Sequence, residues 1–313
     1  MPVLASPSVP TFYFVGVTTG SSSSQRVFPR WMAVLGRPEV VLQGVDFPLH
    51  DEPANYRAFV EFVRREPLAL GGLVTTHKVD LLHAAADLFD GLSPAATALQ
   101  EVSSIARRGE RLLGHATDPS AGGISLDAIT GPGYFRATGA HLLCLGAGGA
   151  AAAIALHLLS KPDPADRPAR FVVVNRSAAR LASLRAIVAP FGNAIEFDYI
   201  LNEDARSNDA QMALLPPNSI VINATGMGKD RPGSPLTDNG VFPEHGIAWD
   251  LNYRGELDFL RQAQRQQAVR DLRVEDGWLY FLHGWAQVIR HVLDLSIDPA
   301  LFDRLGAEAA TLR

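Results

Sequence analysis

One junction constrains the fold of this chain more than any other feature: an apolar run at residues 142–145 leads directly into the segment Gly146-Ala147-Gly148-Gly149-Ala150. The run predicts a buried strand, and the alanines after it predict a helix. Gly146 permits a tight turn, Gly148 lets the backbone approach a pyrophosphate, and the helix start would hold phosphates at the positive end of its dipole. The junction predicts a dinucleotide site, although a tight turn alone also requires glycine.

A second apolar run, at residues 171–174, is followed by Asn175, Arg176, Ser177 and, one helical turn later, Arg180. The end of the second strand is where a dinucleotide-binding domain contacts the adenosine ribose. An acidic residue there binds a free 2′-hydroxyl, whereas arginine accommodates a 2′-phosphate. Two arginines with neutral donors and no carboxylate among them therefore predict NADP, with NAD as the alternative. The competing interpretation is a pair of solvated surface arginines.

Bulk properties describe an ordinary globular protein. The 313 residues suffice for two domains or one large one, and 47% of them are hydrophobic and 19% charged. A net charge of −5 gives no reason to expect nucleic acid or a membrane surface as a partner. Neither a signal peptide nor a membrane span is expected, so we predict a cytoplasmic protein, a monomer or a homodimer. The single cysteine, Cys144, lies in an expected strand and should be an inert core residue.

Hydrophobic periodicity predicts an α/β fold. Strands are expected at residues 12–17, 40–45, 70–74, 195–199, 219–223 and 247–251, and helices at 56–65, 79–89 and 278–295. A hairpin is expected at 105–113, around the turn Arg108-Gly109-Glu110. Residues 119–138, rich in Gly, Ser and Ala, would connect the first third of the chain to the glycine turn.

The order and spacing of several motifs resemble those of the shikimate dehydrogenases over nearly the whole chain. They are a Ser-x-Ser pair, a lysine at a helix start, a Thr-Asp pair, the glycine turn, Asn-Arg-Ser, Asn-Ala-Thr and Asp-x-x-Tyr. The resemblance implies an N-terminal α/β substrate-binding domain, residues 1–118, completed by residues 278–313. It further implies a doubly wound, Rossmann-type NADP-binding domain at residues 119–277, with the reaction in the cleft between the two.

The resemblance also implies roles for individual residues. Ser22 and Ser24 match the hydroxyls that hold the substrate carboxylate, which paired short donors can do without a fixed charge. Lys78 matches the catalytic lysine and Asp118, at a strand end, the aspartate that pairs with it. Such a lysine has its pKa lowered in a partly desolvated cleft and can then exchange a proton with a substrate hydroxyl. Taken singly, each of these residues is ordinary on a protein surface.

Two further segments match the family's site. Asn223, Ala224 and Thr225 correspond to the strand end beside the nicotinamide, and Tyr253 to a tyrosine that approaches the substrate. Both segments are equally compatible with structural turns. Metal ligation is not expected, because His77, His115 and His283 lack metal-ligand spacing.

The positions that would recognise the substrate hydroxyls depart from the family. Gly72 and Val74 replace an asparagine and a threonine, Ser103 replaces the hydroxyl-binding asparagine, Ala116 replaces a second asparagine, and Gly284 replaces a glutamine. Gln287, one turn later, is a partial substitute. Each lost contact should cost roughly 0.5–3 kcal/mol of recognition.

These departures predict a shikimate-dehydrogenase-like enzyme with an altered, more apolar substrate that is still a carboxylate-bearing cyclic alcohol or ketone. The alternatives are a shikimate or quinate dehydrogenase proper and a non-catalytic Rossmann protein that senses a metabolite. The Lys78 and Asp118 pair argues against a pure sensor, because binding alone requires no proton transfer.

Overall fold

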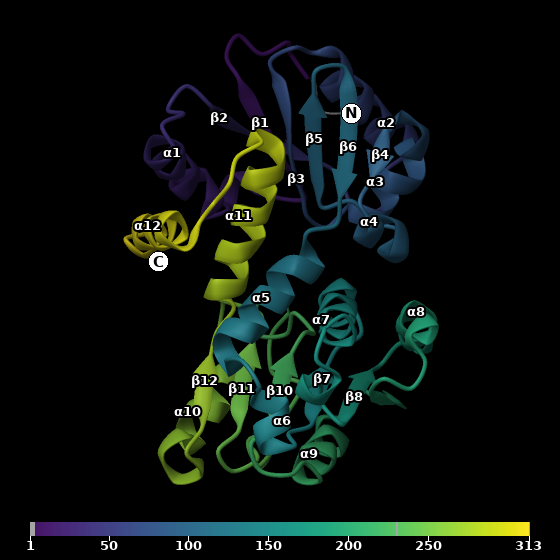
Figure 1. Ribbon diagram of the computed structural model, residues 1–313, viewed down its shortest axis with the longest axis vertical. Coiled ribbons are helices and arrows are strands. Elements are labelled where there is room, and N and C mark those ends of the chain that lie inside the picture. Colours follow the sequence, from purple (N-terminus) through teal and green to yellow (C-terminus); the bar gives the residue numbers. More distant parts are fainter. Residues whose placement is uncertain (1–3, 230, 313) are drawn as a thin grey trace. The chain divides into compact units, whose positions relative to one another are not determined.

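The computed structural model describes residues 4–229 and 231–312 of the chain and divides it into two compact units. The first comprises Met1–Thr117 and Gly284–Arg313, and the second comprises Asp118–His283. The sequence-based boundaries fell at residues 118 and 278. Figure 1 shows the order of the helices and strands along the chain.

The first unit is built on a mixed sheet in the order β2-β1-β3-β5-β6-β4. Its strands are β1 (Thr11–Gly16), β2 (Val41–Asp46), β3 (Ala69–Val74), β4 (Gly91–Leu92), β5 (Ser104–Arg108) and β6 (Arg111–His115). Its helices are α1 (Ser24–Val34), α2 (Pro53–Arg65), α3 (Lys78–Ala85), α4 (Pro94–Leu99), α12 (Pro299–Ala310) and the part of α11 (Trp278–Leu293) from Gly284 onward. The antiparallel pair β5 and β6 is the expected hairpin, with Arg108 opposite Arg111.

Alternation along β1 gives this sheet two apolar faces. Tyr13 and Val15 belong to the core that includes residues of α2 and α3. Phe12 and Phe14 point the other way, because successive strand residues face opposite sides of a sheet. Their rings lie 5.9 and 5.7 Å from that of Trp285 on α11. The C-terminal segment thus packs on the strand that opens the chain.

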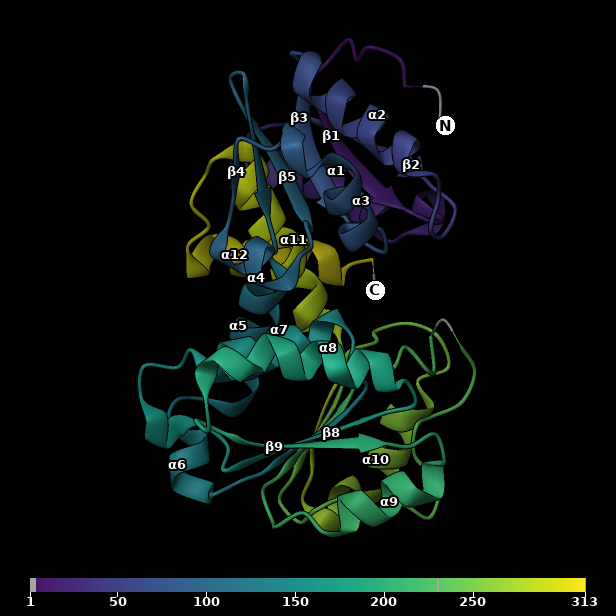
Figure 2. The same cartoon turned by 90° about the vertical axis from the view of Figure 1, so that its right-hand side faces the viewer.

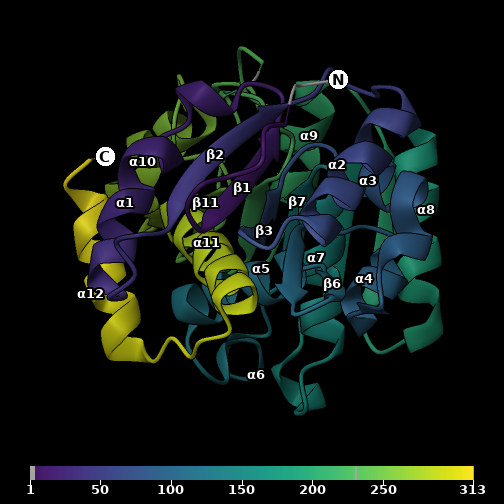
Figure 3. The same ribbon diagram turned by 90° about the horizontal axis from the view of Figure 1, so that it is seen from above.

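Helices α1 and α12 lie side by side in the same unit (Figure 3). The buried indole of Trp31 on α1 donates from Nε1 to the carbonyl of Leu305 on α12 at 2.9 Å. The ring of Trp31 also lies 5.7 Å from that of Trp285. Truncating an aromatic side chain at such a position typically costs about 3–5 kcal/mol, so this cluster fixes the C-terminal helices to the first unit.

The second unit holds a parallel sheet in the order β12-β11-β10-β7-β8-β9. Its strands are β7 (Leu142–Leu145), β8 (Arg170–Asn175), β9 (Glu196–Leu201), β10 (Ile220–Asn223), β11 (Ile247–Asp250) and β12 (Arg273–Glu275). Numbered within the unit, the order is 3-2-1-4-5-6 from the other edge, which is that of the dinucleotide-binding doubly wound fold. The strand order reverses between β7 and β10, so a ligand crevice is expected at the ends of these two strands.

Helices cover both faces of this sheet, with α7 and α8 on one side and α9 and α10 on the other (Figure 2). The helices of the unit are α5 (Asp118–Thr130), α6 (Tyr134–Thr138), α7 (Gly149–Leu159), α8 (Ala178–Val188), α9 (Ala205–Ala213), α10 (Asp258–Arg270) and the first residues of α11. In residues 4–229 and 231–312, no helical segment combines the length and the apolar character that crossing a bilayer requires.

The segment expected only as a connection, residues 119–138, forms the helices α5 and α6. Glycines inside α5 have a packing reason: a Cβ at Gly123 would lie 2.0 Å from Nδ1 of His157 on α7. The missing side chain therefore lets the two helices approach closely. His157 in turn contacts Asp127 of α5 at 2.9 Å, and Lys161 contacts the same carboxylate at 3.1 Å.

Candidate active site

The glycine turn of the second unit has the geometry that a dinucleotide requires. Gly146 has a φ of +122°, and its N–H donates to the carbonyl of Val174 at 2.8 Å. A Cβ at this position would lie 2.5 Å from the carbonyl oxygen of Ala224, so only glycine fits. Because Gly148, which precedes α7, has no side chain, the first amide groups of the helix carry no side-chain cap. Such a helix start is suited to an anion, and it lies at the point where the strand order reverses.

The segment after β8 carries two arginines, one of which, Arg180, lies close to this turn. Asn175 Oδ1 accepts from the N–H of Ser177 at 2.8 Å, and Ser177 Oγ caps α8 by accepting from the N–H of Arg180 at 3.4 Å. Arg176 and Arg180 are exposed, and across the described part of the chain neither guanidinium is in an ion pair. Nη1 of Arg180 lies 3.7 Å from the Cβ position of Gly148. Asn175 and Ser177 shape the loop, and the arginines carry its charge.

The loop after β10 is held by a buried amide and carboxyl network. Asn223 Nδ2 donates to Asp250 Oδ1 and to the carbonyl of Met227, both at 3.1 Å. Asn252 donates from its backbone N–H to the same carboxyl oxygen at 2.9 Å and from Nδ2 to the carbonyl of Met227 at 3.0 Å. Thr225 Oγ1 donates to Asn223 Oδ1 at 2.7 Å. Asn223 and Thr225 therefore build the loop, so within this segment Ala224 is the residue whose backbone carbonyl faces the glycine turn.

Asp250 is the centre of this network. It is the first residue of the Asp-x-x-Tyr motif, for which the sequence predicted a role only at Tyr253. The carboxyl group is fully buried, and burial raises its pKa from 3.8 to about 6. The hydrogen bonds from Asn252 and Asn223 act in the opposite direction, because they stabilise the charged form. An aspartate directly at the end of a buried central strand is a signal by which sequence reasoning could have identified it.

In the first unit the two predicted serines come together. Ser22 Oγ donates to Ser24 Oγ at 3.0 Å, and the N–H of Ser24 donates to Ser22 Oγ at 3.3 Å. Ser24 is the first residue of α1, so the hydroxyl pair lies at the positive end of a helix dipole. The N–H of Thr19 donates to Asp46 Oδ1 at 2.7 Å and ties the loop to the end of β2. Two hydroxyls at a helix start provide donors suited to a carboxylate.

Lys78 is the first residue of α3, as the sequence predicts, and its backbone is fixed from two sides. The N–H of Val102 donates to the carbonyl of Lys78 at 3.1 Å. The preceding residue, His77, is buried, and its Nδ1 lies 3.0 Å from Oη of Tyr56 on α2. His77 and Tyr56 anchor the start of α3 to its neighbour and so position the lysine.

Ser103, which stands where the family has a hydroxyl-binding asparagine, uses its hydroxyl within the protein. Its side chain is fully buried, and its Oγ accepts from the N–H of Thr117 at 2.7 Å and lies 2.9 Å from Thr117 Oγ1. A third contact, at 3.3 Å, joins it to the carbonyl of His115. A hydroxyl has one proton and two lone pairs, so these partners use its capacity. Ser103 therefore anchors the residue before Asp118 and is not available to a substrate hydroxyl.

Within the first unit, this anchoring links the segment that carries Lys78 to Thr117, the residue at which this part of the unit ends. Val102 bonds to Lys78, and its neighbour Ser103 bonds to Thr117, the residue that precedes Asp118. Asp118 is the first residue of α5 and lies three residues beyond the end of β6, whereas the sequence placed it at a strand end. A carboxylate is favoured at that position because the helix dipole is positive there.

Two of the positions that depart from the family, Gly72 and Val74, are enclosed by the protein itself. The pairing of β1 with β3 shifts register between Thr11 and Phe12, which pair with Ala69 and Gly71, so that Leu70 is the extra residue of a bulge in β3. A Cβ at Gly72 would lie 1.9 Å from the carbonyl oxygen of Tyr13, so an asparagine there would require the backbone to move. Val74 is fully buried in the core between the sheet and α2 and α3.

Aromatic side chains surround the predicted substrate tyrosine in the second unit. The ring of Tyr253 lies 4.7 Å from that of Phe281 and 5.5 Å from that of Trp278, both near the start of α11. Further along the same helix, in the first unit, Gln287 is half-buried. A Cβ at Gly284 would meet no described atom within 4 Å. The predicted replacement of glutamine by glycine thus leaves space, and the aromatic residues supply apolar surface.

The remaining titratable candidates do not form a metal site. Burial lowers the pKa of His283 to about 4, which keeps its imidazole neutral at physiological pH. Cys144 is fully buried, and burial raises the pKa of its thiol to about 12. No cluster of three metal-ligating side chains occurs among the residues that the structure describes.

Comparison with known protein sequences shows which family this chain belongs to. No family model matches it. The shikimate dehydrogenase (NADP(+)) of Methylobacterium radiotolerans is 31% identical over 283 residues, which cover 89% of this chain and 89% of the relative. The chain belongs to the shikimate dehydrogenase family. The family and the α/β fold that the sequence predicted are confirmed, and the protein is an oxidoreductase of this family.

Two further similarities fit this membership in the shikimate dehydrogenase family. A shikimate dehydrogenase (NADP(+)) of Symbiobacterium thermophilum is 33% identical over 204 residues, which span 64% of this chain and 65% of the relative, just under two thirds. The structure of shikimate 5-dehydrogenase from Thermus thermophilus, in complex with NADP(H) and shikimate, is 26% identical. It superimposes with a TM-score of 0.67 over 96% of this chain and 99% of that one.

Proposed function

We propose that this member of the shikimate dehydrogenase family transfers a hydride between NADP(H) and a carboxylate-bearing cyclic alcohol or ketone. The observation that carries the proposal is the position of Arg180, whose Nη1 lies 3.7 Å from the Cβ position of Gly148. A cation with no ion-pair partner among the described residues stands over a glycine turn in which any side chain at Gly146 would strike Ala224. This is the charge and shape that a phosphorylated dinucleotide needs.

The residues of the second unit fit NADP. The amide groups at the start of α7 would hold the pyrophosphate, and Arg176 and Arg180 would hold the 2′-phosphate as a bidentate cationic clamp. The loop fixed by Asn223 and Asp250 would support the nicotinamide end. When bound, NADP supplies the hydride acceptor for oxidation or the donor for reduction.

The residues of the first unit would bind the substrate and help to move the proton. Ser22 and Ser24 donate to its carboxylate, assisted by the positive end of α1. During oxidation Nζ of Lys78 would take the proton of the substrate hydroxyl while the carbinol hydrogen leaves as hydride to the bound nicotinamide. Reduction reverses both transfers. Asp118 accepts a hydrogen bond from the same hydroxyl and steadies the ammonium group. Ser103 contributes by positioning Thr117 ahead of Asp118.

We further propose that the substrate is more apolar than shikimate. The space at Gly284, the close approach of the Tyr13 carbonyl to Gly72 and the internal hydrogen bonds of Ser103 would remove three donors or acceptors for ring hydroxyls. The rings of Trp278 and Phe281 around Tyr253 favour an apolar or aromatic ring in the substrate. Shikimate dehydrogenase proper is the second candidate, supported by the relatives' names, and quinate dehydrogenase is a further alternative. We place the enzyme in the cytoplasm, as a monomer or homodimer that acts on small molecules.

Substituting the lysine separates an enzyme from a metabolite sensor. We expect Lys78→Met to lower kcat at least about a hundredfold, because general acid–base catalysis contributes roughly 10²–10⁴-fold. NADP affinity, measured by calorimetry, should stay within about twofold, because Lys78 is not in the unit that carries the glycine turn. His83→Gln, at an exposed position on the same helix, is the matched control and should keep wild-type turnover. Unchanged turnover in Lys78→Met would refute the proposed role.

A further inference from the structure

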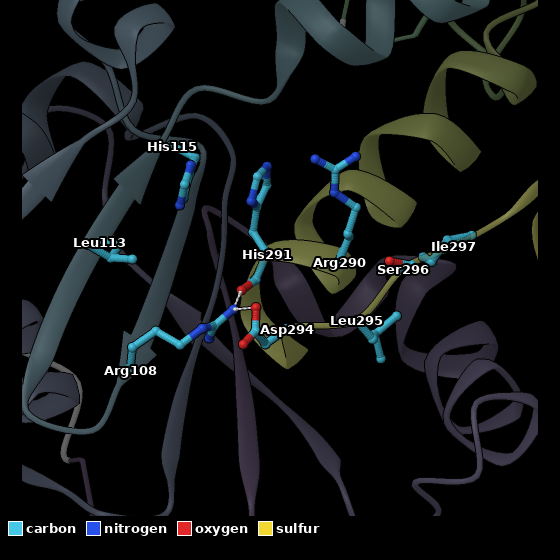
Figure 4. Close-up of a pocket in the computed structure, with 9 residues that line it drawn as sticks. All are labelled: Arg108, Leu113, His115, Arg290, His291, Asp294, Leu295, Ser296 and Ile297. Atoms are coloured by element: carbon cyan, nitrogen blue, oxygen red, sulfur yellow. Dashed lines mark hydrogen bonds and ion pairs between the residues drawn. The ribbon is translucent and has the colours of Figure 1, made fainter.

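A pocket of about 560 Å³ lies within the first unit, along the hairpin β5–β6 and beside the C-terminal end of α11. Its wall includes Arg108, His115, Arg290 and His291, with Leu295 and Ile297 as apolar neighbours (Figure 4). None of the residues assigned above to the substrate or to NADP lines it. It is large enough for a compact organic molecule, since ligand pockets typically measure about 300–1,000 Å³.

The charges in this pocket are mainly positive. Arg108 is held at the helix end, where Nη1 donates to the carbonyl of Val292 at 3.0 Å and Nη2 lies 3.2 Å from Oδ1 of Asp294. Its guanidinium also donates to the carbonyl of His291, as Figure 4 shows. Arg290 is exposed, and within the described ranges no carboxylate neutralises it. Two guanidinium groups thus face one carboxylate.

Two imidazole rings line the same pocket. His115 at the end of β6 and His291 on α11 stack with their centroids 3.9 Å apart and their planes 13° apart. Burial lowers the pKa of both rings, and the charges of Arg108 and Arg290 lower it further. The pKa of His291 falls to about 4, with His115 as an additional cause. Both rings are therefore neutral at pH 7, and each can offer one N–H donor.

We propose that this pocket binds a phosphate monoester with a small apolar body, at a site separate from the dehydrogenase reaction. Arg290 supplies the cation that has no partner, Arg108 adds a second charge already fixed in position, and the imidazole pair supplies neutral donors. Leu295 and Ile297 provide the apolar wall that the body of the ligand contacts. A ligand with a dianionic phosphate matches two guanidinium groups better than a ligand with a single carboxylate does.

Binding of such a dianion reverses the electrostatics of the imidazole pair. The groups that face His115 and His291 are Arg108 from β5, Arg290 from α11 and Asp294 after the helix. A bound phosphate adds negative charge beside the rings and stabilises their protonated forms, so binding is accompanied by proton uptake. Affinity should therefore increase as pH falls from 8 toward 6.5, the range in which the phosphate, with a second pKa of about 6, is still largely dianionic.

The test must report on this pocket alone, because Arg176 and Arg180 offer another place for a phosphate. We would titrate the full chain with phenyl phosphate and with inorganic phosphate at pH 6 and follow the imidazole resonances of His115 and His291 by NMR. The resonances are assigned with His115→Asn and His291→Asn. We expect saturable shifts, tighter for phenyl phosphate, and a raised pKa for at least one ring in the bound state.

Arg290→Gln should weaken this binding at least about tenfold, since hydrogen bonds to charged groups contribute roughly that factor or more. Arg304→Gln removes the same charge from an exposed position on α12 and should leave it unchanged. Far-UV circular dichroism checks that both variants fold. Imidazole resonances that do not move, or equal affinity in Arg290→Gln and wild type, would overturn the proposal. Neither result bears on NADP binding, which a separate titration measures.

Discussion

Asp250 links the stability of the second unit to the loop that we assign to the nicotinamide. Its Oδ1 accepts hydrogen bonds from the backbone of Asn252 and from Asn223, whereas Oδ2 has no hydrogen-bond partner among the described residues. Burial raises the pKa from 3.8 to about 6 in the folded state. The folded protein therefore binds a proton at this group over a pH range in which the unfolded chain has released it.

The sign of the effect follows from this difference. A carboxyl group whose pKa is raised on folding contributes stability that is fully present below about pH 4, the unfolded value, and is lost as pH rises through about 6. A displacement of about two pKa units corresponds to roughly 3 kcal/mol at 1.36 kcal/mol per unit. Between these two pH values this group alone lowers the free energy of unfolding by about 1.4 kcal/mol per pH unit.

Asp250→Asn tests this directly. The variant keeps the Oδ1 acceptor, removes the titration and places an amide N–H₂ where Oδ2 has no partner, at a cost of about 1–3 kcal/mol. At pH 7 this cost and the relief from burying a charge should nearly cancel. We therefore expect near wild-type stability at pH 7 and a flatter dependence on pH.

The assay measures urea unfolding at a series of pH values from 4 to 8. Hydrogen exchange of peptides from β10 and β11 is used as the probe of unfolding, because it reports on the second unit. Asp303→Asn removes an exposed carboxylate from α12 in the first unit and serves as the matched control, with the wild-type slope expected. If Asp250→Asn retained the full wild-type slope between pH 4 and pH 6, the assignment of that slope to Asp250 would be refuted.

Substitutions in three further parts of the site test the account. Replacing Arg176 and Arg180 by serine should weaken NADP binding by about tenfold or more per residue while leaving NAD binding nearly unchanged, measured by calorimetry; equal losses for both cofactors would contradict the clamp. Ser103→Ala should cost about 1–3 kcal/mol of stability in urea unfolding and lower kcat more than it raises KM, because it releases Thr117 ahead of Asp118; a change in KM alone would restore its role as a substrate ligand. A Cβ at Gly284 meets no described atom within 4 Å, so the glutamine of Gly284→Gln has space, and this variant should raise kcat/KM for shikimate. The control Gly284→Ala should only stabilise α11, by roughly 1 kcal/mol. No gain from Gly284→Gln would show that this position does not contact the substrate.

Local chemistry made much of the fold predictable. The strand, glycine turn and helix at residues 142–159 follow from residue types that have few conformational alternatives, and the turn between Arg108 and Arg111 follows from Gly109. The serine pair could likewise be expected from its spacing, because a helix that starts at Ser24 brings Ser22 within hydrogen-bond distance.

Other features depend on neighbours that are distant in the sequence and could not be predicted. Gly123 reads as a helix breaker until His157 is seen to occupy the space of its side chain. Ser103 aligns with a substrate ligand, but its partner Thr117 determines what its hydroxyl does. The pocket with His115 and His291 exists only because α11 returns to the hairpin β5–β6. Periodicity and spacing describe one segment at a time, whereas these contacts join two.

The most direct test of the proposed function is the rate of NADP reduction with shikimate, quinate and a panel of cyclic hydroxy acids that carry fewer ring hydroxyls. We expect NADP-linked turnover in which kcat/KM for shikimate is well below that for a more apolar acid, because three hydroxyl-recognising contacts are missing. Shikimate turnover with a low KM and the highest kcat/KM of the panel would contradict the altered substrate site. Absence of turnover with every acid, despite tight NADP binding, would contradict the proposed substrate class.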